Sequence, residues 1–266
     1  MTERPSNPTL AQVKEITQPD SVTGRAMAEH WAGTLYLRKL SPYLTKPLLK
    51  TSITANGVTW IMIAFGFGAG LTILIPGPLG LFLPMLMAQM QMLWDCVDGE
   101  VARWRQTFSP MGAFLDRVGH YLAESSIPIA LGLRVAGWPD KPIDGSIFPF
   151  IGAFLATLVV FNKGMNDAVH VSRAMSGLGK LPDTKGMNLS NKSLLRTARK
   201  IVSFFPFHRV MHSIEMTIFI AILGVAQLIT NNEQMLQYGL IAVFITALFS
   251  TPLHVAAIVT SNKLKA

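Results

Sequence analysis

The chain has 266 residues, of which 50% are hydrophobic and only 14% are charged. Soluble domains average about 25% charged residues, so this composition argues against an ordinary soluble globule, and it excludes a disordered chain. Cys96 is the only cysteine, which excludes a disulfide-stapled secreted domain. The net charge is +8, but the sequence contains no nucleic-acid-binding motif, so nucleic acid is not expected as a partner.

The N-terminal segment 1–50 is polar at first and amphipathic later. Its first 25 residues contain no apolar core, so we expect no cleaved secretory signal. From residue 27 to 49, aromatic and aliphatic residues are mixed with basic ones, which is typical of a segment lying at a membrane interface. We expect Pro42 to interrupt this segment. A loosely packed cytoplasmic arm is the alternative.

Apolar stretches in the rest of the chain predict six membrane-spanning helices. No charged side chain occurs in the 44 residues between Lys50 and Asp95, about twice the length that one span needs. Pro76-Gly77-Pro78 divides this stretch, and further turns are expected at Gly137-Trp138-Pro139-Asp140 and at Asn231-Asn232. The expected spans are residues 53–75, 79–101, 112–135, 147–172, 210–229 and 235–260.

The distribution of lysine and arginine predicts the orientation of these spans. Twenty of the 23 basic residues lie in alternate segments, namely 1–50, 102–117, 173–209 and the C-terminal tail. The intervening loops hold only Lys141, so both termini are expected in the cytoplasm. The sequence thus predicts an all-α, multi-pass integral protein of the plasma membrane. A cytoplasmic and interfacial segment at 1–50 would precede a six-helix domain at 51–262, with a basic cytoplasmic loop at 174–208.

One stretch carries the candidate chemistry. Asp95 and Asp98 are spaced i, i+3, and Asp116 and His120 are spaced i, i+4, so each pair shares one helix face. Two antiparallel helices would aim these four side chains at one point near the cytoplasmic boundary. Acids that converge in an apolar setting repel one another, which favours one or two divalent cations, Mg²⁺ or Mn²⁺, together with substrate phosphates. Ordinary helix-end charges are the alternative.

Smaller residues complete this stretch. Gly99 and Ala102 leave room for a ligand beside the helix, and Arg103 is a natural partner for a phosphate or for one of the acids. The whole stretch resembles the signature of the CDP-alcohol phosphotransferases, Asp-x-x-Asp-Gly-x-x-Ala-Arg-x8-Gly-x3-Asp-x3-Asp. The matching residues are Asp95, Asp98, Gly99, Ala102, Arg103, Gly112 and Asp116. The segment Thr54–Thr59 resembles, more weakly, the start of the first span in that family, with Ala55 in place of a proline.

The resemblance implies an enzyme that moves a phosphate-linked group from a CDP-activated donor to the hydroxyl of a small polar alcohol or polyol. CMP would leave, and the donor would be CDP-diacylglycerol in phospholipid synthesis at the cytoplasmic face. It further implies a homodimer, two metal ions, and a Gly112 that lets the two motif helices pack closely. The implied metal ligands are Asp95, Asp98, Asp116 and His120, and the implied nucleotide contacts are Asn56, Asp95, Gly99, Ala102, Arg103 and Gly112.

His120 departs from the signature, whose last residue is aspartate. Three interpretations remain open. As the general base beside Asp116, the imidazole would take the proton from the attacking alcohol, which suits its titration near neutrality. It could instead be a metal ligand or substrate contact, and histidine suits Mn²⁺ better than Mg²⁺. Catalysis could also be lost or altered.

The acceptor site is predicted at the cytoplasmic end of the fourth span, because polar residues within a span are functional candidates. The candidates are Lys163, Asp167, His170 and Arg173. Alternatively, Lys163 pairs with Asp167 and Arg173 reaches lipid phosphates. His212 and Glu215 are further candidates, and Glu124 is a candidate for orienting His120.

Three rival functions remain. The enzyme could use a soluble CDP-alcohol, or a sugar or polyol acceptor for cell-surface polymers. It could be an inactive homologue that binds CDP-lipid. A transporter is disfavoured, because the acids cluster at one end of the spans rather than along a path.

Overall fold

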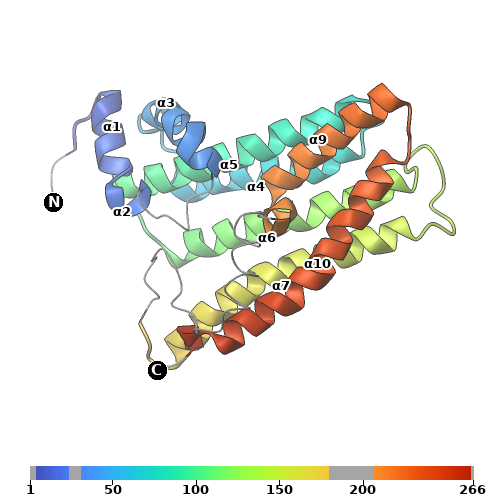
Figure 1. Ribbon diagram of the computed structural model, residues 1–266. Coiled ribbons are helices and arrows are strands. Elements are labelled where there is room, and N and C mark those ends of the chain that lie inside the picture. The colour runs from blue at the N-terminus through green and yellow to red at the C-terminus, as the bar shows by residue number, and fades with distance from the viewer. Residues whose placement is uncertain (1–3, 24–30, 180–206, 265–266) are drawn as a thin grey trace. The chain divides into compact units, whose positions relative to one another are not determined.

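The computed structural model describes residues 4–23, 31–179 and 207–264, and these ranges contain helices and no strand (Figure 1). The chain forms two compact units. Among the described residues, unit 1 comprises 4–23, 31–66 and 87–122, and unit 2 comprises 67–86, 123–179 and 207–264. The all-α prediction is therefore confirmed for the described part of the chain. The predicted loop 174–208 lies mostly outside it.

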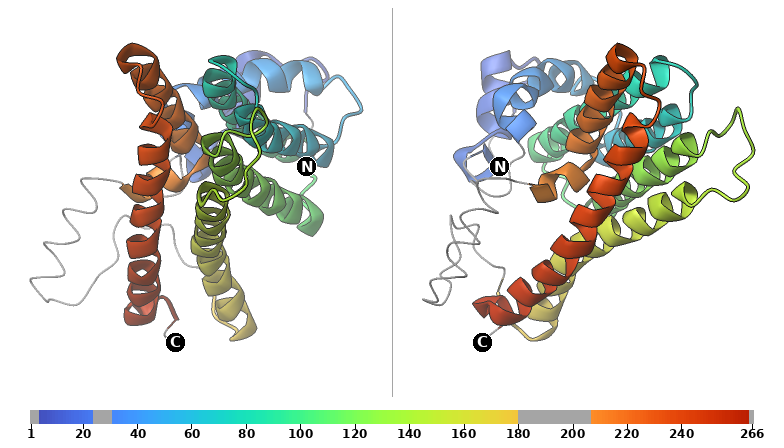
Figure 2. Two further views of the ribbon diagram at one scale, coloured as in Figure 1. Left: turned by 90° about the vertical axis from the view of Figure 1, so that its right-hand side faces the viewer. Right: turned by 45° about the vertical axis from the view of Figure 1, so that its right-hand side comes forward.

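Long helices occupy all six predicted segments. They are α4 (Ala55–Ile73), α5 (Leu79–Arg105), α6 (Pro110–Val135), α7 (Phe148–Met175), α9 (Ser213–Thr230) and α10 (Met235–Thr260). The predicted turns fall between them: Gly77 has φ 73° between α4 and α5, and Asn231 has φ 51° after α9. Glycine and asparagine tolerate this left-handed conformation best, which explains why the chain turns there. In unit 2, α10 packs along α7, as Figure 2 shows, and against α9.

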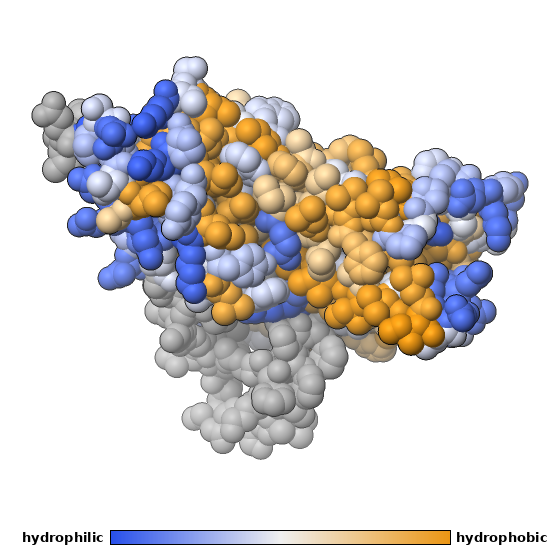
Figure 3. All heavy atoms as spheres, turned by 90° about the horizontal axis from the view of Figure 1, so that it is seen from above, coloured by the Kyte–Doolittle hydropathy of each residue, from blue (hydrophilic) through white to orange (hydrophobic). Residues whose placement is uncertain are grey.

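Four helices, α4, α7, α9 and α10, are long and apolar enough to cross a membrane. The 27-residue α5 and the 26-residue α6 are as long, but polar and charged side chains interrupt their apolar stretches. Large apolar side chains are widely exposed, for example Phe249, Leu253 and Val259 on α10, and Figure 3 shows broad apolar areas on one face of the molecule. Such surface suits lipid rather than water. A membrane protein is thus supported, while the number of six spans and the cytoplasmic termini stay predictions.

The N-terminal segment is helical as well. It contains α1 (Leu10–Thr17), α2 (Asp20–Thr23), the π-helix Gly33–Leu37 and α3 (Arg38–Leu48). The prediction that Pro42 interrupts this segment is wrong, because α3 continues through it. A proline in a helix leaves the carbonyl four residues earlier without its donor. Here that carbonyl belongs to Arg38, and the side-chain amide of Gln18 donates to it at 2.7 Å.

Arg134 fastens the turn between α4 and α5 within unit 2. Its guanidinium donates to the carbonyls of Ile73, Ile75 and Gly77 at 2.7, 2.6 and 2.8 Å. We expect Arg134→Met to lower the free energy of unfolding by about 2–3 kcal/mol, because three carbonyls lose a charged donor. Unfolding in detergent micelles measures this. Lys141→Met, at an exposed position of the next loop, is the control, and an equal loss there would contradict the role of Arg134.

Candidate active site

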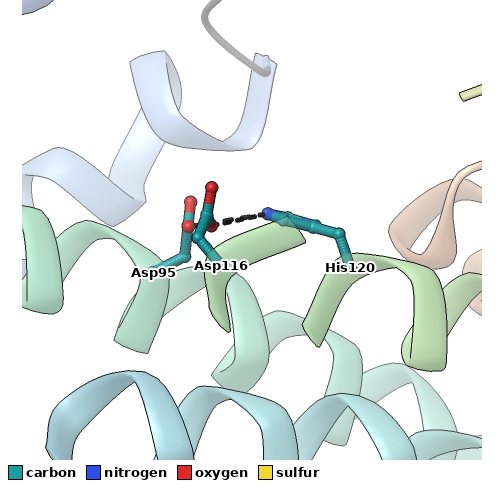
Figure 4. Close-up of side chains that lie close together, drawn as sticks. All are labelled: Asp95, Asp116 and His120. Atoms are coloured by element: carbon teal, nitrogen blue, oxygen red, sulfur yellow. Dashed lines mark ion pairs between the residues drawn. The ribbon is translucent and has the colours of Figure 1, made fainter. Parts of the chain in front are cut away.

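Three side chains of the motif meet in unit 1 (Figure 4). The Nε2 atom of His120 lies 3.5 Å from Asp95 Oδ1 and 3.5 Å from Asp116 Oδ1. Helix α5 supplies Asp95, and α6 supplies the other two from successive turns, as their spacing predicts. The exposed fractions of the side chains of His120, Asp95 and Asp116 are 18%, 26% and 44%. The three side chains are therefore partly buried, yet the cluster remains open to a ligand.

The donor set of this cluster fits a divalent cation. One ligand atom of each residue lies within 4.8 Å of the other two. Two carboxylates at this separation repel each other, and a cation between them would remove the repulsion. Carboxylates serve both Mg²⁺ and Mn²⁺, whereas an imidazole favours Mn²⁺.

Asp98 stands next to the three-residue cluster rather than inside it. Its Oδ2 accepts a hydrogen bond from Thr59 Oγ1 at 2.8 Å. It also lines a cavity of about 510 Å³, to which Asp116 contributes too. Asp116 therefore belongs to both the cluster and the cavity wall. The structure brings three of the four predicted metal ligands together, and the metal role of Asp98 stays a prediction.

The cavity is lined by most of the residues that the motif assigns to the nucleotide. Four of the six are in its wall: Asn56, Gly99, Ala102 and Gly112. The loop between α5 and α6 closes another side with Phe108 and Ser109. A cavity of this size can take a large part of a nucleotide ligand.

Arg103 lies over Gly99, next to this cavity. A β-carbon on Gly99 would lie 3.0 Å from Nη1 and 3.2 Å from Nη2 of Arg103, so a larger residue would push the guanidinium away. The Nε atom donates to the carbonyl of Thr17. The Nη2 atom is buried and finds no hydrogen-bond partner among the described residues. An anionic ligand would satisfy such a nitrogen.

The family model described as CDP-alcohol phosphatidyltransferase matches residues 52–185, which is half of the chain. The chain belongs to this family. The matched range contains the whole motif, the cluster and the cavity wall, and the resemblance inferred from the sequence is confirmed. The protein is thus a membrane enzyme of the CDP-alcohol phosphotransferase type, a family that generally depends on divalent metal. A search of curated proteins gave no match.

Two details of this CDP-alcohol phosphotransferase differ from the sequence analysis. Gly112 brings α6 close to α4 rather than to α5: a β-carbon there would lie 3.0 Å from Asn56 Oδ1 and meet no atom of α5 within 4 Å. Thr59, the partner of Asp98, was not assigned to the site at all. The signal that could have found it is its i, i+3 spacing from Asn56, which places both on one face of α4.

The predicted acceptor residues lie in unit 2, where the structure gives two of them other contacts. Lys163 Nζ lies 2.8 Å from Glu124 Oε1, and His212 Nδ1 lies 3.2 Å from the same oxygen. Arg173 donates to the carbonyls of Lys263 and Gly179. His170 is exposed. A role of Lys163, Asp167, His170 and Arg173 in acceptor binding by this CDP-alcohol phosphotransferase stays a prediction.

Proposed function

We propose that this enzyme transfers a phosphatidyl group from CDP-diacylglycerol to the hydroxyl of a small polar alcohol or polyol and releases CMP. It would act as a homodimer in phospholipid synthesis at the cytoplasmic face of the plasma membrane. The observation that supports this most is the meeting of Asp95, Asp116 and His120 at the edge of a cavity lined by the nucleotide residues of the motif.

The acidic and the basic residues of the site have different tasks in this proposal. Asp95, Asp98 and Asp116 would hold divalent cations, and such cations would supply positive charge to neutralise the diphosphate and stabilise the departing CMP. Arg103 pairs with a phosphate oxygen, and Gly99 and Ala102 leave room for the nucleotide.

His120 has the best position to handle the proton. Neutral Nε2 accepts the proton of the acceptor hydroxyl, and the alcohol oxygen attacks the phosphorus that carries the lipid. The bond from that phosphorus to the bridging oxygen then breaks, and CMP leaves with the electron pair. Because Nε2 has a single lone pair, it serves either as base or as metal ligand, and the ligand role is the alternative.

A CMP-release assay tests the proposed function. The purified protein in mixed micelles with Mn²⁺ or Mg²⁺ is given CDP-diacylglycerol and a panel of alcohols, polyols and sugars. We expect CMP and a new phospholipid. CMP from a soluble CDP-alcohol alone would favour the rival donor class. Metal-dependent binding of CDP-diacylglycerol without CMP release would favour an inactive homologue, and failure of both binding and release would overturn the proposal.

Cysteine labelling tests the proposed orientation. In a Cys96→Ser background, Ser146→Cys and Asn232→Cys should react with a membrane-impermeant maleimide added to intact cells, because they lie in the loops expected outside. Ser109→Cys, between α5 and α6, should react only after the cells are opened. Ser190, a further position expected in the cytoplasm, lies outside the described residues. The reverse pattern would place the site on the wrong side for cytoplasmic donors.

A further inference from the structure

The N-terminal residues Arg4–Gln18, called the N-terminal arm below, contact the motif end of α5 inside unit 1. The carbonyl of Thr17 accepts a hydrogen bond from Arg103 Nε. The side-chain amide of the next residue, Gln18, donates to Glu100 Oε1 at 2.8 Å. Two neighbouring residues of the arm thus hold two side chains of α5 that are one turn apart.

A third contact extends this attachment to the start of the arm. The guanidinium of Arg4 lies 5.4 Å from the ring centre of Trp104, a distance typical of a cation–π contact. Glu100, Arg103 and Trp104 are spaced i, i+3 and i+4 along α5, so the arm covers one face of this helix. Val13, in the middle of the arm, is fully buried. The arm is therefore packed against the motif end of α5.

Glu100 is the anchor of this arrangement. It is fully buried, and its carboxylate accepts hydrogen bonds from Gln18, Ser41 and Thr45, the last at 2.6 Å. A buried carboxylate is costly without such donors, so this network fixes Gln18 firmly. The carbonyl of Thr17 is one peptide unit away and is fixed with it.

The fixed carbonyl determines where the guanidinium of Arg103 lies. The group is planar, so binding at Nε sets the direction of both terminal nitrogens. They lie over Gly99, which lines the cavity, and Nη2 has no hydrogen-bond partner among the described residues. A side chain that is already ordered loses less conformational entropy when a ligand binds.

We propose that the N-terminal arm is a positioning element of the nucleotide site. The bond between Gln18 and Glu100 holds the Thr17 carbonyl in place, and this carbonyl presents Arg103 to a phosphate of the CDP-linked donor. Gln18 and Glu100 touch no ligand and act through Arg103. This inference rests on the proposed function.

Gln18→Glu tests the inference, because it sets a second carboxylate against Glu100. We expect KM for CDP-diacylglycerol and Kd for CMP to rise about 10-fold, with kcat changed less than about 2-fold. In an Arg103→Ala background, Gln18→Glu should add nothing, because the residue that it positions is gone. Adding Glu100→Gln to Gln18→Glu restores a donor–acceptor pair and should recover most of the affinity. If Gln18→Glu fails to fold, Gln18→Ala replaces it in the test. This variant adds no charge and should also raise KM.

Tyr36→Phe is the matched control. Its hydroxyl also joins the N-terminal segment to α5, at Gln89, away from Arg103, so its loss should leave KM unchanged. Three results would overturn the inference. KM could rise equally in Tyr36→Phe, it could rise further when Gln18→Glu is added to Arg103→Ala, or it could stay unchanged in both Gln18 variants. If the parent protein neither binds CMP nor releases it, the proposed function fails as well. If the parent protein binds and releases CMP but the variants behave in one of these ways, only the role of the arm is wrong.

Discussion

Asp116→Asn is expected to reduce CMP release by at least about 1,000-fold, which is on the order of 4 kcal/mol of transition-state stabilisation. Asp116 is the one carboxylate that belongs to both the His120 cluster and the cavity wall. Asparagine keeps the size of the side chain but removes the negative charge that would hold a cation beside the diphosphate. Turnover with CDP-diacylglycerol at saturating Mn²⁺ and Mg²⁺ measures the loss.

The same loss is expected for Asp95→Asn and Asp98→Asn, because each leaves one ligand fewer. The fold should survive all three changes, since in the absence of metal each one relieves repulsion between acids. Unchanged thermal unfolding without metal would therefore show that these carboxylates serve function rather than stability. Asp140→Asn, in an exposed loop, should keep full activity. Near-parent turnover of any of the three site variants would overturn the metal assignment.

The features that the sequence predicted well are set by local patterns. Long apolar runs, the prolines around Gly77 and the asparagine pair at 231 determined where helices begin and end. The spacing of Asp116 and His120 placed both on one face of α6, and an i, i+4 pair keeps this relation wherever the helix lies. Helix existence and the core of the site therefore follow from periods of three and four residues.

The features that the sequence did not predict depend on contacts between distant segments. Arg103 and Thr17 are 86 residues apart, and no local pattern marks the carbonyl that receives the guanidinium. The continuity of α3 through Pro42 depends on Gln18, which replaces the missing donor from another helix. Likewise, tertiary packing decides which helix lies next to Gly112. A glycine in a sequence indicates that space is needed beside the backbone, but it does not indicate which group fills that space.

His120→Ala is expected to slow the chemical step about 100- to 10,000-fold, the usual contribution of a general base. Donor affinity should change little, because His120 itself is not part of the wall of the nucleotide cavity. His120→Asp restores the residue of the family signature and should keep more activity than His120→Ala. Single-turnover rates and donor Kd values separate the two effects. An alanine variant that turns over like the parent would show that His120 is not the base.

The pH profile of His120→Asp distinguishes a base from a metal ligand. If Nε2 accepts the proton, parent activity falls as the pH decreases, because a protonated imidazole has no free lone pair. In His120→Asp this fall should then move to lower pH, since a carboxyl group protonates at lower pH than an imidazole. If Nε2 binds the cation instead, His120→Asp should shift the metal preference from Mn²⁺ towards Mg²⁺, which a base role does not require. His120→Gln, which keeps much of the size but cannot accept the proton, should resemble His120→Ala in rate. A glutamine variant with parent turnover would exclude the base role.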